Sequence, residues 1–175
     1  IKDIICMLDY VFLQYPFIDR KLIGIMGHSF GGYISLMCII RNPEIFNFCI
    51  AINCPVDLLD SLKGAYTSGN IERDRIFKRI GNPMKDIDFL KSNSPFYNID
   101  KIITPFLLIN SKFDEKVDRK QILQFVDKCE RAKKAVTHIE INEKHVFVDR
   151  NNMQVMYSCI EKYIRDRMVK NGKIF

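Results

Sequence analysis

Apolar residues in this sequence gather in short runs that are separated by longer polar or amphipathic segments. Short continuous apolar runs bounded by polar residues are typical of strands buried in a parallel sheet. We therefore predict strands at residues 21–27, 45–53 and 105–110. A fourth strand is predicted at 136–141, where apolar and polar residues alternate and His138 lies on the more polar face.

Between these runs, apolar residues recur every three or four positions, which is the spacing of one helix face. The first such segment starts at Ile4 and ends before Pro16, and the segment at 31–40 is apolar on nearly all sides. The other predicted helices lie at 56–62, 71–80, 86–92, 119–133 and 152–169. Strands that alternate with helices predict an α/β fold, with a mostly parallel sheet flanked by helices on both faces. No repeat or linker divides the chain, so residues 1–175 are predicted to form a single domain.

Composition and charge narrow the class of protein. Hydrophobic residues make up 47% of the 175 residues and charged residues 27%, as in globular domains. The net charge is +6, but the basic residues are scattered, and their densest group, at 128–134, ends a predicted helix. We therefore expect no nucleic-acid partner. No apolar run approaches the length of a membrane span, and the charges among the first fifteen residues are unlike a signal peptide, so we expect no membrane association.

The six cysteines form no CxxC pair, and most of them lie within apolar runs. A free thiol in such a run behaves as a small hydrophobic side chain. This pattern predicts neither a metal site nor a disulfide framework, and it favours the reducing cytoplasm. We also expect no cofactor.

The segment Gly27-His28-Ser29-Phe30-Gly31 lies between the first predicted strand and a buried helix. A GxSxG pattern in this context is typical of a nucleophile elbow, in which a strained serine is exposed on a sharp turn. Glycines are expected at positions 27 and 31 because the turn leaves no room for side chains. The helix that follows directs free N–H groups towards the serine oxygen. The pattern therefore predicts Ser29 as a nucleophile.

A serine nucleophile needs a general base, and the histidines of this chain are His28, His138 and His145. His28 is adjacent to Ser29 within the tight turn, where neighbouring side chains rarely point at one another. His138 lies in the middle of a predicted strand. His145 lies on the loop after the last strand, where a base is accessible, and is therefore the predicted base.

The base in turn needs a carboxylate that fixes its tautomer and stabilises its charged form. Asp114 follows the third predicted strand by a few residues. Asp57, after the second strand, is the alternative, but it also looks like part of a helix start, and Asp118 is a helix N-cap candidate. The order Ser29, Asp114, His145 is the order of the α/β-hydrolase fold.

Three segments resemble the catalytic domain of the prolyl oligopeptidase family of serine peptidases. Residues 21–33, KLIGIMGHSFGGY, resemble the family's elbow, including Gly32 and Tyr33. Residues 94–121, SPFYNIDKIITPFLLINSKFDEKVDRKQ, resemble the segment around its catalytic acid, and NEKHVF at 142–147 resembles its histidine loop. Two departures are the replacement of usual glycines by Ser111 and Lys112 before the acid and by Lys144 before the histidine.

The resemblance implies an α/β-hydrolase fold and hydrolysis of peptide bonds through an acyl-enzyme on Ser29, with Asp114 as acid and His145 as base. It also implies that the backbone N–H of Phe30 binds the oxyanion, and that a second donor comes from an earlier strand. The family has strands before the elbow that this chain lacks. The chain is therefore interpreted as the C-terminal portion of the domain, with the N-terminal strands missing.

Two further hypotheses come from the same residues. One is hydrolysis of a carboxylic ester or thioester, because the elbow does not determine the acyl group. The other is an inactive fragment that pairs the sheet edge at 21–27 with another chain, either a second copy or a longer parent chain. For an active enzyme we expect a peptide or small acyl substrate.

Overall fold

The computed structural model describes residues 1–62 and 70–170 of the chain. In these ranges the strands are β1 (Gly24–His28), β2 (Phe48–Ile52), β3 (Phe106–Ser111) and β4 (Val136–Ile141). The helices are α1 (Lys2–Gln14), α2 (Phe30–Arg41), α3 (Leu58–Ser61), α4 (Asn70–Ile80), α5 (Ile87–Ser92), α6 (Arg119–Arg131) and α7 (Arg150–Lys170), with 3-10 turns η2 (Pro95–Tyr97) and η3 (Ile99–Lys101). Their positions follow the apolar pattern closely.

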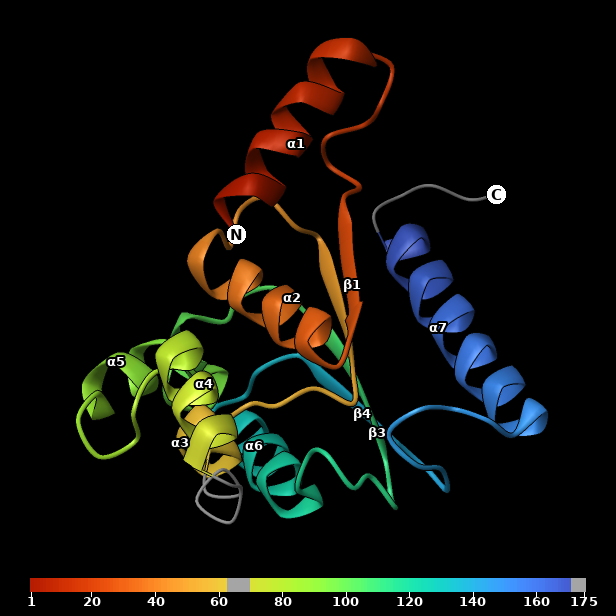
Figure 1. Cartoon of the computed structure of the whole chain (residues 1–175). Coiled ribbons are helices and arrows are strands. Elements are labelled where there is room, and N and C mark those ends of the chain that lie inside the picture. The colour runs from red at the N-terminus through yellow and green to blue at the C-terminus, as the bar shows by residue number, and fades with distance from the viewer. Residues whose placement is uncertain (63–69, 171–175) are drawn as a thin grey trace.

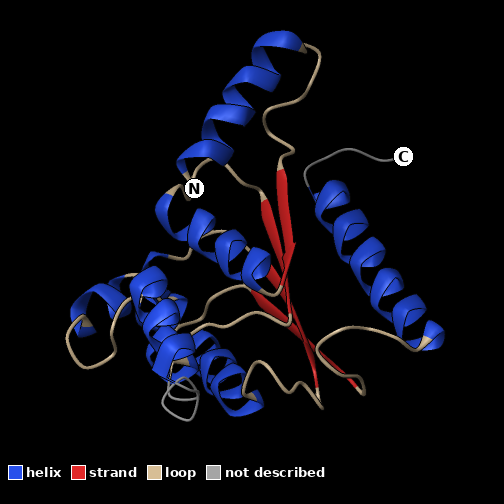
Figure 2. Cartoon of the chain, viewed as in Figure 1, coloured by secondary structure: helices blue, strands red, loops and turns tan. Residues whose placement is uncertain are grey.

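The strands form one parallel sheet in the order β1-β2-β3-β4. Figure 2 shows the sheet between two layers of helices. Helices α2 and α6 pack against one face, with α3, α4 and α5 further out on the same side, and α7 covers the other face (Figure 1). This arrangement confirms the predicted α/β fold. Because the strands are parallel, their carboxyl ends meet at one edge of the sheet, where sites of α/β proteins lie.

Two apolar clusters fill the space between the sheet and its helices. The first lies towards α2 and α6, and β3 contributes Phe106 and Leu108 to it. The second lies under α7, and β3 contributes Leu107 and Ile109 to it. All residues of β3 are buried, since the strand has a neighbour on each side and helices on both faces. The alternation of its side chains between two cores explains its unbroken apolar sequence.

The expectation that the strand at 21–27 forms a sheet edge is confirmed, but the prediction that this strand is buried is wrong for β1. Exposed and half-buried residues alternate along this strand, and Met26 is 58% exposed. β1 is the edge strand of the sheet, and the cluster under α7 contains residues of β2 but none of β1 among the described residues. The apolar run therefore predicted the position of the strand, but it did not indicate which elements cover the strand.

Helix α1 extends beyond the end of the sheet (Figure 1). Ile4, Ile5 and Leu8 pack partly against the first core cluster, whereas Met7 and Tyr10 are exposed. The amphipathic pattern of α1 predicts one buried face, but none of its residues is fully buried. Within the described ranges, no helix combines the length and the apolar character that crossing a membrane requires.

Candidate active site

The structure brings the predicted nucleophile, base and acid together at the carboxyl edge of the sheet. The Ser29 Oγ and His145 Nε2 atoms are 2.8 Å apart. The His145 Nδ1 atom lies 2.9 Å from each carboxylate oxygen of Asp114. Because a carboxylate only accepts, Nδ1 carries the proton in this pair, and Nε2 of the neutral ring accepts from the Ser29 hydroxyl. The three groups thus form one directed chain of hydrogen bonds.

Each of these side chains comes from a loop at a strand end. Ser29 follows β1 directly, Asp114 follows β3, and His145 follows β4. The side chains of His145 and Asp114 are 10% and 3% exposed. This burial removes competing water from the His145–Asp114 contact, which strengthens the electrostatic interaction between imidazole and carboxylate.

The Ser29 backbone has the strained geometry of a nucleophile elbow. Its φ of 55° lies in the left-handed region that non-glycine residues rarely occupy. Ser29 N donates to the Ile52 carbonyl at 2.7 Å, and Tyr33 N donates to the Ser29 carbonyl at 3.1 Å. Ser29 is the N-cap of α2, but its side chain makes no capping hydrogen bond. The hydroxyl is therefore directed to His145 instead of the helix.

Two glycines of the elbow are required because a side chain there would collide with neighbouring atoms. A Cβ at Gly27 would lie 2.3 Å from the Gly31 carbonyl carbon, and a Cβ at Gly32 would lie 2.7 Å from the Cys54 Cβ. Gly31 differs, because a Cβ there would meet no atom within 4 Å. The expectation that position 31 has no room for a side chain is wrong. The Gly31 backbone matters here as the surface against which Gly27 packs.

The loops of the acid and the base need no glycine in their observed conformations. Among the described non-glycine residues, a positive φ occurs at Ser29, Asn53 and Lys133. Lys112 and Lys144, which replace family glycines, are therefore free of left-handed strain. Asp114 is instead fixed by its own turn, in which Oδ1 accepts hydrogen bonds from the backbone N–H groups of residues 116 and 117 at 2.8 and 2.9 Å.

The alternative acids are occupied elsewhere. Asp57 caps α3, where its Oδ1 accepts from Leu59 N at 2.9 Å, and its Oδ2 accepts from the Tyr97 hydroxyl at 3.0 Å. Burial, together with the Asp57 carboxylate, raises the pKa of Tyr97 to about 12, so its hydroxyl remains a donor. Asp118 caps α6 by accepting from Lys120 N. Both aspartates thus have the helix-start role that their sequence context predicts.

The other two histidines do not contact Ser29 as bases. His138 is half-buried in β4, and its Nε2 lies 2.5 Å from Asn110 Oδ1. Burial lowers the pKa of His138, which favours the neutral ring. His28 Nε2 lies 2.9 Å from the backbone carbonyl oxygen of His145. His28 therefore contacts the base itself, a role that sequence reasoning missed.

A second missed residue is Asn53, at the carboxyl end of β2. Its Nδ2 donates to the His145 carbonyl at 2.8 Å and to Ser111 Oγ at 2.9 Å, and its Oδ1 accepts from Ser111 N at 2.7 Å. The sequence contains one usable signal for this residue, since a polar amide closes an apolar run at a strand end. Nothing in the sequence indicates its partner, which is a backbone carbonyl.

The loop that carries His145 is also held by carboxylates. Glu115 Oε2 accepts from His145 N at 3.3 Å. Glu143 accepts from the backbone N–H groups of Lys144 and Asp149 at 3.0 and 3.1 Å. These backbone hydrogen bonds lower the pKa of Glu143, because they favour its ionised form.

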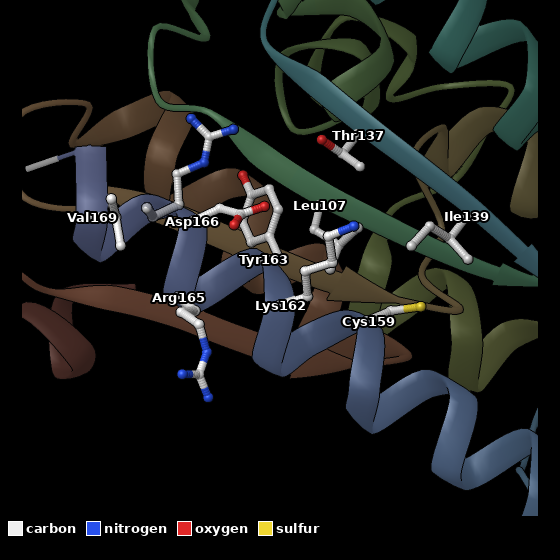
Figure 3. Close-up of a pocket in the computed structure, with 10 residues that line it drawn as sticks. Leu107, Thr137, Ile139, Cys159, Lys162, Tyr163, Arg165, Asp166 and Val169 are labelled. Atoms are coloured by element: carbon white, nitrogen blue, oxygen red, sulfur yellow. The ribbon is translucent and has the colours of Figure 1, made fainter. Parts of the chain in front are cut away.

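A cavity of about 580 Å³ lies away from this site, between α7 and the strands β3 and β4. Figure 3 shows its lining, which includes Leu107, Thr137 and Tyr163 but none of the three predicted catalytic residues. In the described part of the chain, no group of three or more His, Cys, Asp or Glu side chains could hold a metal ion.

Comparison with known proteins identifies the family. Residues 1–170 match the sequence profile of the prolyl oligopeptidase family. Dipeptidyl peptidase family member 6 of Caenorhabditis elegans is 24% identical over 151 residues, which cover 84% of this chain and 20% of that protein. Inactive dipeptidyl peptidase 10 of Mus musculus is 28% identical over 117 residues, covering 66% of this chain and 13% of that protein.

A solved structure shares the fold. The uncomplexed acylaminoacyl peptidase of Pyrococcus horikoshii superposes with a TM-score of 0.77 at 25% identity, covering 93% of this chain and 27% of that one. The chain thus spans a fifth or less of the two curated relatives and about a quarter of the solved structure. Its sheet is part of an α/β-hydrolase fold, and the chain belongs to the prolyl oligopeptidase family.

Proposed function

We propose that this chain carries the nucleophile, base and acid of a serine peptidase, with Ser29, His145 and Asp114 in these roles. The observation that carries the proposal is the continuous hydrogen-bond chain from Ser29 Oγ through the His145 ring to Asp114. The three side chains lie far apart in the sequence, yet they meet with the donor and acceptor directions that nucleophilic catalysis requires.

In the proposed reaction, Ser29 Oγ attacks the carbonyl carbon of a peptide bond while His145 Nε2 takes the hydroxyl proton. Asp114 accepts the Nδ1–H bond throughout and stabilises the imidazolium. When the tetrahedral intermediate collapses, the C–N bond breaks and His145 returns the proton to the leaving amine. Water then attacks the acyl-enzyme with His145 again as base, which releases the acid and restores the Ser29 hydroxyl.

The N-terminus of α2 supports the oxyanion in this proposal. Phe30 is the first residue of α2, and the first N–H groups of a helix have no partner within it. The Phe30 N–H is therefore available beside Ser29, with the positive end of the helix dipole behind it. One oxyanion donor of this kind is worth about 10²–10³ in kcat.

The amide bond is proposed as substrate because the similar proteins named above include dipeptidyl and acylaminoacyl peptidases. The test is a panel of aminoacyl and acylaminoacyl p-nitroanilides against p-nitrophenyl esters of short acids, with Ser29→Ala as the matched control. We expect release of p-nitroaniline that is lost in Ser29→Ala. Turnover of esters alone would reassign the substrate class, and turnover that survives in Ser29→Ala would exclude Ser29 as nucleophile.

A further inference from the structure

We propose that Asn53 and His28 are positioning residues, which hold the backbone carbonyl of His145 and thereby keep its ring in line with Ser29 and Asp114. The inference rests on the proposed function, in which His145 is the base. We call the hydrogen bonds from Asn53 and His28 to the His145 carbonyl a clamp. The clamp acts on the main chain of the base and is distinct from the three reacting side chains.

Asn53 connects the base to the strand that precedes the acid. Its side chain makes three hydrogen bonds, two to Ser111 at the end of β3 and one to the His145 carbonyl. Asn53 is 1% exposed, so water does not compete for these bonds. Its φ of 45° is a conformation that asparagine tolerates better than most residues. This buried side-chain amide is thus held in one orientation, with its Nδ2 donor directed at the His145 carbonyl.

His28 connects the base to the strand that precedes the nucleophile. A carbonyl oxygen only accepts hydrogen bonds, so His28 Nε2 must carry a proton to make its 2.9 Å contact with His145. The two imidazole rings lie with their centroids 5.1 Å apart, which restricts sideways movement of the catalytic ring. Since His28 is the last residue of β1, the serine and its base share one support.

The carbonyl of His145 therefore receives one donor from β1 and one from the residue after β2, and the second donor is itself bonded to β3. Three strand ends thus converge on a loop that has no regular secondary structure of its own. The N–H of the same residue has a longer contact, 3.3 Å, to the exposed Glu115. Because a displacement of about 1 Å can cost about 10² in rate, fixing this main-chain position matters for proton transfer.

The first test is NMR of the chain labelled with ¹⁵N-histidine, because this measurement does not require turnover. We expect His28 as the Nε2–H tautomer and a downfield His145 Nδ1 proton bonded to Asp114. In His28→Phe, which keeps a ring but removes the donor, that proton should broaden or disappear. His28→Gln, which restores an N–H donor at similar reach, should recover it. An unchanged His145 proton in His28→Phe would overturn the role of His28.

Asn53→Asp tests the other half of the clamp, since it keeps the acceptor for Ser111 N but removes the donor to His145. Its matched control is Asn98→Asp, another buried asparagine whose amide donates to backbone carbonyls, those of residues 91, 92 and 94. We expect loss of the His145 Nδ1 signal in Asn53→Asp and its retention in Asn98→Asp. Retention in a folded Asn53→Asp variant, or equal loss in both variants, would overturn the role of Asn53.

The rate at which a fluorophosphonate labels Ser29 is a second measurement, and it distinguishes failure of the clamp from failure of the proposed function. The rate of fluorophosphonate labelling at Ser29 should fall about 10- to 100-fold in His28→Phe and recover in His28→Gln. Labelling of the unmodified chain with unchanged rates in His28→Phe and Asn53→Asp would contradict the clamp and leave the proposed function intact. A chain that resists labelling while NMR shows the clamp-dependent proton would contradict the proposed function and support the clamp.

Discussion

β1 and β3 each lead to a predicted catalytic side chain, yet the two strands have very different surroundings. β3 is central and buried along its whole length, and Asp114 lies on the loop that follows it. β1 is an edge strand with exposed positions, and Ser29 follows it directly. The acid is therefore supported by two core clusters, whereas the nucleophile depends on local backbone contacts.

These local contacts are specific to the elbow. Ser29 N is bonded to Ile52 of β2, Gly27 packs against Gly31, and Gly32 packs against Cys54. An edge strand can thus present a strained serine if its end is fixed to the neighbouring strand and to the following helix. The comparison teaches that core burial and backbone packing are two separate ways of positioning a catalytic group.

The largest expected effect is on the acid. Asp114→Asn keeps the shape of the side chain but removes the charge that stabilises the imidazolium and favours the Nδ1–H tautomer of His145. We expect a fall of about 10⁴ in kcat on the amide substrate. Asp57→Asn, the N-cap of α3, is the matched control and should change kcat only a few-fold. An equal fall in both variants would mean that the loss is not specific to Asp114, and would contradict its role as the acid.

The next largest effect is on stability, and it differs between a buried residue of β3 and an exposed residue of β1. Leu108 in β3 is fully buried, whereas Met26 in β1 is 58% exposed. Leu108→Ala should lower the free energy of unfolding by about 2–5 kcal/mol, because it removes buried methyl groups and leaves a cavity. Met26→Ala should cost less than about 1 kcal/mol. Urea unfolding of both variants measures the difference, and equal costs would mean that β1 is covered in solution.

A smaller effect tests the elbow. Gly27→Ala forces a Cβ against the Gly31 backbone, which should cost about 1–3 kcal/mol and slow labelling of Ser29. Gly31→Ala places its Cβ in open space near the start of α2 and should be neutral or stabilise by up to about 1 kcal/mol. Thermal unfolding measures the change in stability of each variant, and the rate of fluorophosphonate labelling measures the reactivity of Ser29. If Gly31→Ala proves as damaging as Gly27→Ala, the proposed difference in space between the two glycines is contradicted.

The smallest effect concerns pH and the His145 loop. The pKa of Glu143 is lowered from its ordinary value of 4.5 by backbone hydrogen bonds. A lowered folded-state pKa contributes stability that is present above about pH 4.5 and is lost as the pH falls through the lowered value. In Glu143→Gln, the difference in unfolding free energy between pH 7 and acid pH should therefore shrink. Exposed Glu44→Gln is the control, and an equal change in both variants would contradict the assignment.

Much of the fold could be predicted because its buried strands leave a clear signal. β3 is an unbroken apolar run, and the prediction for 105–110 differs from the observed Phe106–Ser111 by one residue at each end. The burial of β1 was predicted wrongly, because apolar composition indicates that a segment can be covered but not what covers it. Ser29, Asp114 and His145 were accessible to prediction since each lies just after a strand.

The rest of the site depends on contacts that a sequence does not record. Asn53 and His28 both donate to a main-chain carbonyl, and every residue but proline has the same backbone groups, so no residue type marks the acceptor. The open space at Gly31 is likewise a property of the packed turn. Motif order thus predicts which side chains form the candidate site, and only the three-dimensional structure identifies what holds them.

The most direct test of the central assignment is fluorophosphonate labelling of the purified chain, with the modified residue located by peptide mass. Ser29→Ala and His145→Ala are the controls. We expect a single adduct on the peptide that contains Ser29, absent in both variants, because only a serine activated by His145 reacts. A folded chain that takes up no probe, or that is labelled equally in His145→Ala, would contradict the proposed Ser29–His145–Asp114 site.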